Sequence, residues 1–173
     1  MIFVDVSAPS LNKARQNCPC EYLSRAEFVC CDGLGDIDAD TAIIAGMGGL
    51  ETISILEGAK HLPSKLVLQP MRNQSDLRAY LTQNYEIMRD FKFHDYKFYD
   101  LIVAEKCAHP QTLTDKELEF GKTNLTHPTQ DFIDYLQAEI TKLHNIPIFS
   151  DNPSLQARAK VLEQILAELT ANI

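Results

Sequence analysis

The chain has 173 residues, of which 45% are hydrophobic and 23% charged, and its formal net charge at pH 7 is −8. This size fits one ordinary domain plus an appendage, and the composition excludes a disordered, a collagen-like and a membrane protein. The longest apolar stretch, residues 41–50, contains three glycines and is too short to span a bilayer. The first residues lack the basic and apolar regions of a signal peptide, so we expect a cytoplasmic protein.

The first two thirds of the sequence alternate short β-type runs with helical runs. The apolar runs predict strands at residues 2–4, 26–30, 41–45 and 66–68. The helical spacings predict helices at residues 11–16, 50–58 and 77–84. Two later runs, residues 87–93 and 98–105, predict an antiparallel pair at one edge. Strands rich in Val and Ile with helices between them indicate a largely parallel α/β sheet that is covered on both faces.

From about Thr126 the pattern changes to two long helical stretches. Apolar residues recur at three- and four-residue intervals over residues 132–143 and again over residues 155–169. A segment with two prolines, residues 145–153, separates the two stretches. Thr126 and Asn152 are the expected N-terminal caps. The pattern predicts an antiparallel helical hairpin.

The sequence therefore divides into an α/β domain, residues 1–125, and a helical hairpin, residues 126–173. Charge is spread unevenly, because residues 31–59 carry six acidic and no basic groups, whereas residues 60–106 carry eight basic against six acidic groups. The acidic total argues against nonspecific nucleic-acid binding, which depends on neutralising phosphates. A local basic face within residues 60–106 remains compatible with these numbers.

The five cysteines give no sign of a metal or redox site. Cys18 and Cys20 are one residue apart, Cys30 and Cys31 are adjacent, and Cys107 stands alone. Zinc knuckles and redox pairs need a two-residue gap that is missing here. We expect reduced structural cysteines and assign no metal.

Acidic residues follow the first two predicted strands. Asp5 closes the first strand, and Asp32 closes the second with Gly33 directly after it. In open α/β sheets ligands bind beyond the carboxyl ends of the strands, where a carboxylate can accept hydrogen bonds from ribose hydroxyls or an adenine amino group. A glycine there lets the backbone approach a base. The alternatives are a helix cap for Asp5 and an ordinary turn residue for Asp32.

Three glycines follow the third strand, in the segment Gly46-Met47-Gly48-Gly49. Such a strand-to-helix turn indicates positive φ angles or a close approach of backbone to a ligand. The dinucleotide fingerprint fails, because its third glycine position is occupied by Glu51, and the Gly-Lys-Ser/Thr of a P-loop is missing as well. The turn thus gives no support to a nicotinamide-dependent oxidoreductase.

Several segments carry a family resemblance when taken in order. They are residues 5–14, 31–34, 43–49 with Ala-Gly-Met-Gly-Gly, 66–70 with Leu-Gln-Pro, and 99–105. Together they resemble the bacterial tRNA adenine-N1 methyltransferases that act on adenine 22, and the resemblance covers nearly the full chain. It implies a Rossmann-like sheet of the class I methyltransferases with a C-terminal antiparallel helical hairpin.

The resemblance also implies S-adenosylmethionine (SAM) as cofactor and tRNA as substrate. Asp5 would bind the SAM ribose, and Asp32 with Gly33 would bind the adenine ring. Four residues of the glycine turn would lie against the methionine part of SAM and the target base: Ala45, Gly46, Met47 and Gly48. Three more would flank the same pocket: Gln69, Pro70 and Asn73.

Basic residues of the central stretch are the candidates for tRNA phosphate contacts. They are Arg72, Arg78, Arg89, Lys92 and Lys97. The alternative is that they are ordinary surface charges. The helical hairpin would grip the tRNA body, or else serve packing or dimer formation. No catalytic base is assigned, because adenine N1 already carries a lone pair at neutral pH.

One departure from the family pattern concerns the start of the sheet. The first strand and glycine loop of the family should precede Asp5, where the sequence has residues 1–4 alone. We therefore expect a sheet without its central strand, reduced stability or self-association through the sheet edge or the hairpin, and weak or absent SAM binding. The second hypothesis for the function is an inactive methyltransferase fold that acts as an RNA- or protein-binding module.

Overall fold

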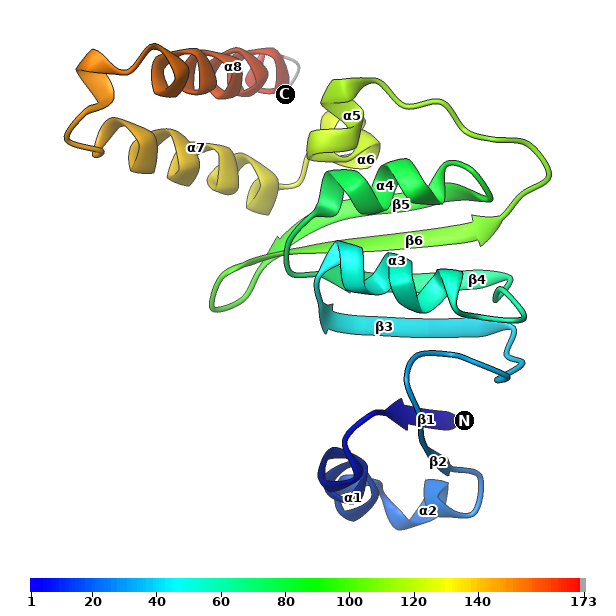
Figure 1. The fold of residues 1–173 in the computed structure, drawn as a ribbon. Coiled ribbons are helices and arrows are strands. Elements are labelled where there is room, and N and C mark those ends of the chain that lie inside the picture. Colours follow the sequence, from blue (N-terminus) through cyan, green and yellow to red (C-terminus); the bar gives the residue numbers. More distant parts are fainter. Residues whose placement is uncertain (172–173) are drawn as a thin grey trace.

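The computed structural model describes residues 1–171, which form an α/β body with a helical hairpin attached (Figure 1). Its strands are β1 (Ile2–Asp5), β2 (Glu27–Cys30), β3 (Thr41–Met47), β4 (Lys65–Pro70), β5 (Tyr85–His94) and β6 (Phe98–Lys106). Its helices are α1 (Ala8–Asn17), α2 (Cys20–Leu23), α3 (Gly49–Glu57), α4 (Gln74–Leu81), α5 (Asp115–Phe120), α6 (Lys122–Thr126), α7 (Gln130–His144) and α8 (Pro153–Thr170). Among these helices none is long and apolar enough to cross a membrane.

The strands fall into two sheets. β1 and β2 pair in parallel, whereas the other four strands form a mixed sheet in the order β3-β4-β6-β5. β5 and β6 are antiparallel, as predicted. β1 and β3 point the same way (Figure 1) but share no backbone ladder within residues 1–171. The expected gap in the sheet therefore falls between β1 and β3.

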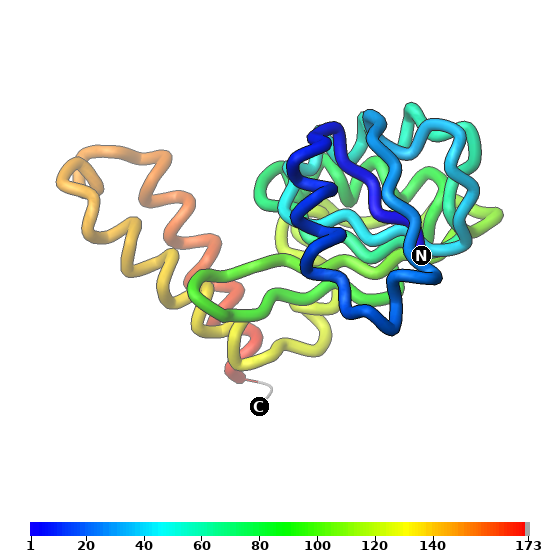
Figure 2. The backbone as a smooth tube through the Cα atoms, turned by 90° about the horizontal axis from the view of Figure 1, so that it is seen from below, coloured from blue at the N-terminus to red at the C-terminus, as the bar shows by residue number. Residues whose placement is uncertain are grey.

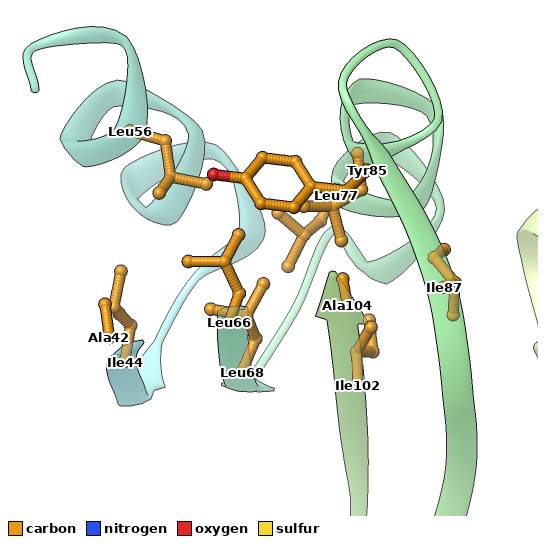
Figure 3. Close-up of a cluster of buried hydrophobic side chains, with 11 residues drawn as sticks. Ala42, Ile44, Leu56, Leu66, Leu68, Leu77, Tyr85, Ile87, Ile102 and Ala104 are labelled. Atoms are coloured by element: carbon orange, nitrogen blue, oxygen red, sulfur yellow. The ribbon is translucent and has the colours of Figure 1, made fainter. Parts of the chain in front are cut away.

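The core of the larger sheet lies between its strands and the helices α3 and α4 (Figure 3). Strand alternation buries Leu66 and Leu68 against Leu56 of α3 and Leu77 of α4. On the opposite face, Ile43 of β3 is 74% exposed. The prediction of helices over both faces is wrong for this sheet, because α3 and α4 lie on the same side of it.

A buried arginine joins α4 to the antiparallel strands. The guanidinium of Arg78 is fully buried and donates to both carboxylate oxygens of Asp90, at 2.6 and 3.0 Å, and to Asp100 at 3.1 Å. Lys92 donates to the second oxygen of Asp100 at 2.7 Å. Burial disfavours the charged guanidinium, but the two carboxylates outweigh it and raise the pKa of Arg78 above its usual value.

The same guanidinium also closes the C-terminal turn of α5. It donates to the carbonyl oxygens of Leu118 and Glu119 at 2.9 and 3.0 Å. With the bonds to Asp90 and Asp100, all five N–H donors of Arg78 have a partner. Arg78 therefore fixes α4, β5, β6 and α5 relative to one another.

Side chains seal the outer edge of β5. Four of its backbone N–H groups each donate to a side-chain oxygen at a distance of 3.0 Å: those of Ile87, Asp90, Lys92 and His94. The acceptors come from the segment that follows the sheet: Gln111, Thr123, Asn124 and Asp131. An edge strand with its donors occupied in this way offers little to a foreign strand.

The helices α7 and α8 form the predicted hairpin, which projects from the α/β body in both views (Figures 1 and 2). Its apolar seam includes Phe132, Leu136 and Leu162, and the same cluster contains Phe120, which precedes the predicted boundary at residue 126. α8 starts at the predicted cap Asn152. The predicted cap Thr126 is wrong, because Thr126 ends α6 and the hydroxyl of Thr129 caps α7.

Removing Asp90 should destabilise the fold strongly. In Asp90→Ala the buried guanidinium of Arg78 loses its bidentate partner, and we expect the free energy of unfolding to fall by about 3–5 kcal/mol. Urea denaturation followed by circular dichroism measures this. Glu139→Ala, which removes the partner of the exposed Lys142, is the matched control and should leave stability unchanged. Equal stabilities of the two variants would contradict the role of Arg78.

Alkaline pH should weaken the fold through the buried phenol of Tyr85 and the partly buried phenol of Tyr135. Burial raises the pKa of Tyr85 and of Tyr135 to about 12 each, against ~10 in an unfolded chain. The stability from the neutral phenols is present below pH ~10 and is lost as the pH rises toward ~12. Urea denaturation across this range should show a smaller loss in Tyr85→Phe, and the full loss in Tyr96→Phe, whose phenol is 93% exposed. The same loss in both variants would refute the assignment.

Candidate functional site

The predicted site residues lie at the carboxyl ends of β1, β2, β3 and β4. Asp5 ends β1, and Asp32 with Gly33 forms the turn after β2. Three residues end β3 and the next one caps α3: Ala45, Gly46, Met47 and Gly48. Four more lie at the end of β4 or in the turn that follows it: Gln69, Pro70, Arg72 and Asn73. β1 and β3 point the same way (Figure 1), so these groups face one edge of the body.

The half-buried Asp5 organises the turn into α1. One of its carboxylate oxygens accepts the backbone N–H of Ser7 at 2.7 Å, and Ser7 is the N-cap of α1. The helix-cap alternative for Asp5 is wrong, because Ser7 is the cap, and Asp5 instead fixes the turn that leads to it. Its second carboxylate oxygen can accept a bond from a ligand. Asp32 is exposed, and Gly33 after it has a φ of +68°, which favours glycine.

Gly46 and Gln69 come together across the ends of β3 and β4. The φ of Gly46 is +76°, and its N–H donates to the side-chain oxygen of Gln69 at 2.9 Å. The β3–β4 register shifts between Ala45 and Met47, which is a bulge that redirects the chain at the strand end. The side chain of Gln69 thus holds the glycine turn in place. Pro70 after it is buried.

The turn before α4 packs directly on the glycine turn. The N–H of Gly49 donates to the carbonyl of Arg72 at 2.8 Å, and a Cβ at Gly49 would come within 3.0 Å of that oxygen and closer still to the carbonyl of Asn73. Asn73 has a φ of +56°, the one positive value of a non-glycine residue in the described chain. Left-handed backbone of this kind is frequent at functional sites. Sequence reasoning did not select Gly49, although the glycine run contained the signal.

Arg72 is the basic residue of the turn between β4 and α4. Its guanidinium pairs with Glu51 of α3, and both side chains are substantially exposed. A hydrogen bond from its own backbone and another from Arg72 lower the pKa of Glu51, so this carboxylate stays ionised. The guanidinium is accessible to an anion from solvent.

Two of the predicted phosphate contacts are corrected by the structure. Arg78 is fully buried and Lys92 is 8% exposed, and both belong to the ion network with Asp90 and Asp100. Their charges are used inside the fold, so neither reaches an RNA phosphate. Strand alternation held the missing signal, since it places Asp90, Lys92 and Asp100 on the buried face of β5 and β6.

Two surface hollows lie away from this edge. One of about 340 Å³ lies between α5 and α8, beside Thr114 and Glu168, and one of about 320 Å³ lies beside Met1 and Arg25. The candidate site is therefore defined by the strand ends and their side chains. Carboxylates after β1 and β2 and a glycine turn after β3 define a Rossmann-like α/β protein with a nucleotide-binding type of edge.

Comparisons with known proteins assign the chain within that class. It belongs to the tRNA (adenine(22)-N(1))-methyltransferase family TrmK, whose family model matches residues 1–171. A Mycoplasma genitalium protein, named as a proposed tRNA methyltransferase, is 35% identical over 85 residues, which are 48% of this chain and 38% of that protein. A second curated relative, from Mycoplasma pneumoniae, is matched over 58% of its length, so the chain spans less than two thirds of these relatives.

Solved structures share the fold at low sequence identity. A crystal structure from Streptococcus pneumoniae, named as a proposed tRNA (m1A22) methyltransferase, has a TM-score of 0.82 and 23% identity, covering 95% of this chain and 81% of that one. A Mycoplasma capricolum TrmK structure with S-adenosylhomocysteine (SAH) has a TM-score of 0.76 and 21% identity, and the match covers 96% of this chain and 80% of that one. These structures confirm the Rossmann-like methyltransferase fold that the sequence predicted.

A methyl group at Gly49 should disturb the site. Gly49→Ala pushes a Cβ into the Arg72–Asn73 backbone, and we expect the free energy of unfolding to fall by about 1–3 kcal/mol. Gly58→Ala is the matched control, because a Cβ there would stand 3.4 Å from the Ser54 carbonyl in ordinary helical backbone, so its stability should not fall. Thermal denaturation measures the stability of both variants. A Gly49→Ala variant as stable as the wild type would contradict the close packing of the two turns.

Proposed function

We propose that the chain transfers a methyl group from SAM to N1 of adenine 22 in tRNA. The observation that carries the proposal is the family match over residues 1–171 on a fold whose strand ends present Asp5, Asp32 and the glycine turn. A second structure of the Streptococcus pneumoniae protein, with a TM-score of 0.79, is a complex with SAM. The setting would be the bacterial cytoplasm, where tRNA is modified.

The chemistry of the strand ends suits SAM. The carboxylate of Asp5 would accept hydrogen bonds from the ribose hydroxyls, and that of Asp32 would accept from the adenine amino group, with Gly33 beneath the ring. The backbone from Ala45 to Gly48 would lie along the methionine part. A Cβ at Gly46 would meet nothing within 4 Å, so the glycine turn leaves space beside it.

The reaction asks for orientation rather than for proton transfer. SAM, when bound, supplies a methyl group on a positively charged sulfur that leaves as a neutral thioether. The lone pair of adenine N1 forms the new N–CH₃ bond as the S–CH₃ bond breaks, so the positive charge passes to the adenine ring and no proton moves. The chain has to hold the base in line with the methyl group and exclude water.

The turn between β4 and α4 is placed to receive the base. N1 lies on the Watson–Crick edge, so adenine 22 must be unpaired or extruded before it can react. Gln69, Pro70 and Asn73 would flank the base, and the accessible guanidinium of Arg72 would contact a tRNA phosphate. The α7–α8 hairpin, which projects from the body, would contact the tRNA further away.

The second candidate is a binding module without catalysis. The observation that favours it is the gap in the sheet, because Asp5 and Gly46 belong to strands that are not hydrogen-bonded to each other. The expectations of weak SAM binding, reduced stability and self-association through the open β3 edge rest on the same gap.

A methyl-transfer assay with two tRNA transcripts separates these candidates. Incubation with radiolabelled SAM should label an unmodified tRNA that carries adenine 22, and should leave a matched transcript with guanine 22 unlabelled. Mass spectrometry of the digested product should detect 1-methyladenosine. Binding of both transcripts without any methylation would favour the binding module. Equal labelling of the two transcripts would contradict the target position.

A further inference from the structure

We propose that the outer face and turn of the β5–β6 pair form a stacking surface for unpaired RNA bases. The surface, called the hairpin platform here, consists of Arg89, Phe91, Phe93, Tyr96, Lys97 and Tyr99. The inference rests on the proposed function and deepens it, because it names how the nucleotides around the target adenine would be held.

The platform side chains that lie on the strands share one face of them. Asp90, Lys92 and Asp100 point to the buried side, where they meet Arg78 or each other. The alternating residues of β5 therefore point to the opposite face, and Phe93 pairs with Tyr99 across the two strands.

The platform combines aromatic rings with cations. The guanidinium of Arg89 lies 5.2 Å from the ring centre of Phe91, and the ammonium of Lys97 lies 5.4 Å from that of Tyr99. The rings of Phe93 and Tyr99 are stacked, with centroids 5.4 Å apart and planes 22° apart. Tyr96 is 93% exposed. Stacking rings interleaved with cations are what single-stranded nucleic acids bind.

The turn of the platform lies at the same edge as the candidate site. β6 runs antiparallel to β4, with Leu68 opposite Ile102, so β6 begins where β4 ends. Figure 1 shows the β5–β6 turn on the side where β3 ends. The turn that carries Tyr96 and Lys97 therefore lies at the edge that would receive the target base.

Extruding an adenine explains why such rings would be useful. When one base leaves its stack, its neighbours lose a stacking partner, and the exposed ring of Tyr96 beside the half-buried rings of the platform can replace that partner. Asp95 is the acidic residue of the turn, and its N–H donates to the carbonyl of Lys97 at 3.1 Å. With Arg89 and Lys97 the platform keeps a positive excess, which suits a polyanion.

The test compares the double variant Tyr96→Ala/Lys97→Ala with a matched control. The control is Tyr22→Ala/Arg25→Ala, with Tyr22 in α2 and Arg25 just after it. Arg25 also lies 5.4 Å above an exposed tyrosine ring, but beside the start of β1, where its carbonyl accepts from the N-terminal ammonium of Met1. Fluorescence anisotropy measures binding of a labelled oligoadenylate of about ten nucleotides and of its duplex with oligouridylate. We expect the platform variant to bind the single strand at least ~10-fold more weakly, with at most a twofold change for the duplex. The control should bind like the wild type.

The outcomes separate this inference from the proposed function. Wild-type affinity of the platform variant for the single strand would overturn the platform, even if the wild type methylates tRNA. An equal loss on single strand and duplex would also overturn it, because that pattern indicates charge alone. A third outcome is that the wild type does not methylate tRNA, while the platform variant binds the single strand more weakly than the wild type does. That outcome would support the platform and contradict the methyltransferase proposal. Unchanged thermal denaturation of both variants shows that the fold is intact.

Discussion

The buried guanidinium of Arg78 is the interaction on which most of the larger sheet depends. Its donors all end on oxygen atoms of β5, β6 or α5, so α4 cannot move without breaking ion pairs in the interior. Asn73 is the N-cap residue of α4, and the turn before α4 contacts Gly49. The buried ion pairs of Arg78 thus hold the helix whose N-terminal turn packs on the glycine turn of the candidate site. Breaking such a network leaves an uncompensated charge, which is why it constrains the fold so strongly.

The two edges of the larger sheet differ in what covers their backbone. The β5 edge is sealed by side chains of the segment that leads into the helical hairpin, which ties that hairpin to the sheet. The β3 edge carries the exposed Ile43 and shares no ladder with β1 in the described part of the chain. The carboxylates proposed to bind the cofactor and the glycine turn therefore lie on two separately paired units. Any ligand that spans Asp5 and Gly46 would add a connection between them, so binding and stability are expected to rise together.

Much of this arrangement could be predicted from the sequence. Apolar runs predict every strand, the strand ends indicate Asp5 and Gly46 as site residues, and the family resemblance adds Gln69. The sequence pattern does not predict the helices α5 and α6, because they are short and depend on a capping box at Thr114 and on contacts with β5. Arg78 was assigned to the surface because composition shows a charge but not its burial. That burial depends on Asp90 and Asp100, which are brought opposite Arg78 by strand pairing that no local pattern encodes.

The most direct test of the account is calorimetric titration of the folded chain with SAH. The account predicts weak but measurable binding that is lost in Asp5→Ala and kept in Asp38→Ala, which removes an exposed carboxylate of the acidic stretch 31–59. Such a result would show that the strand-end carboxylate holds the cofactor. An affinity unaffected by Asp5→Ala, or no binding by a chain that is folded by circular dichroism, would contradict the account.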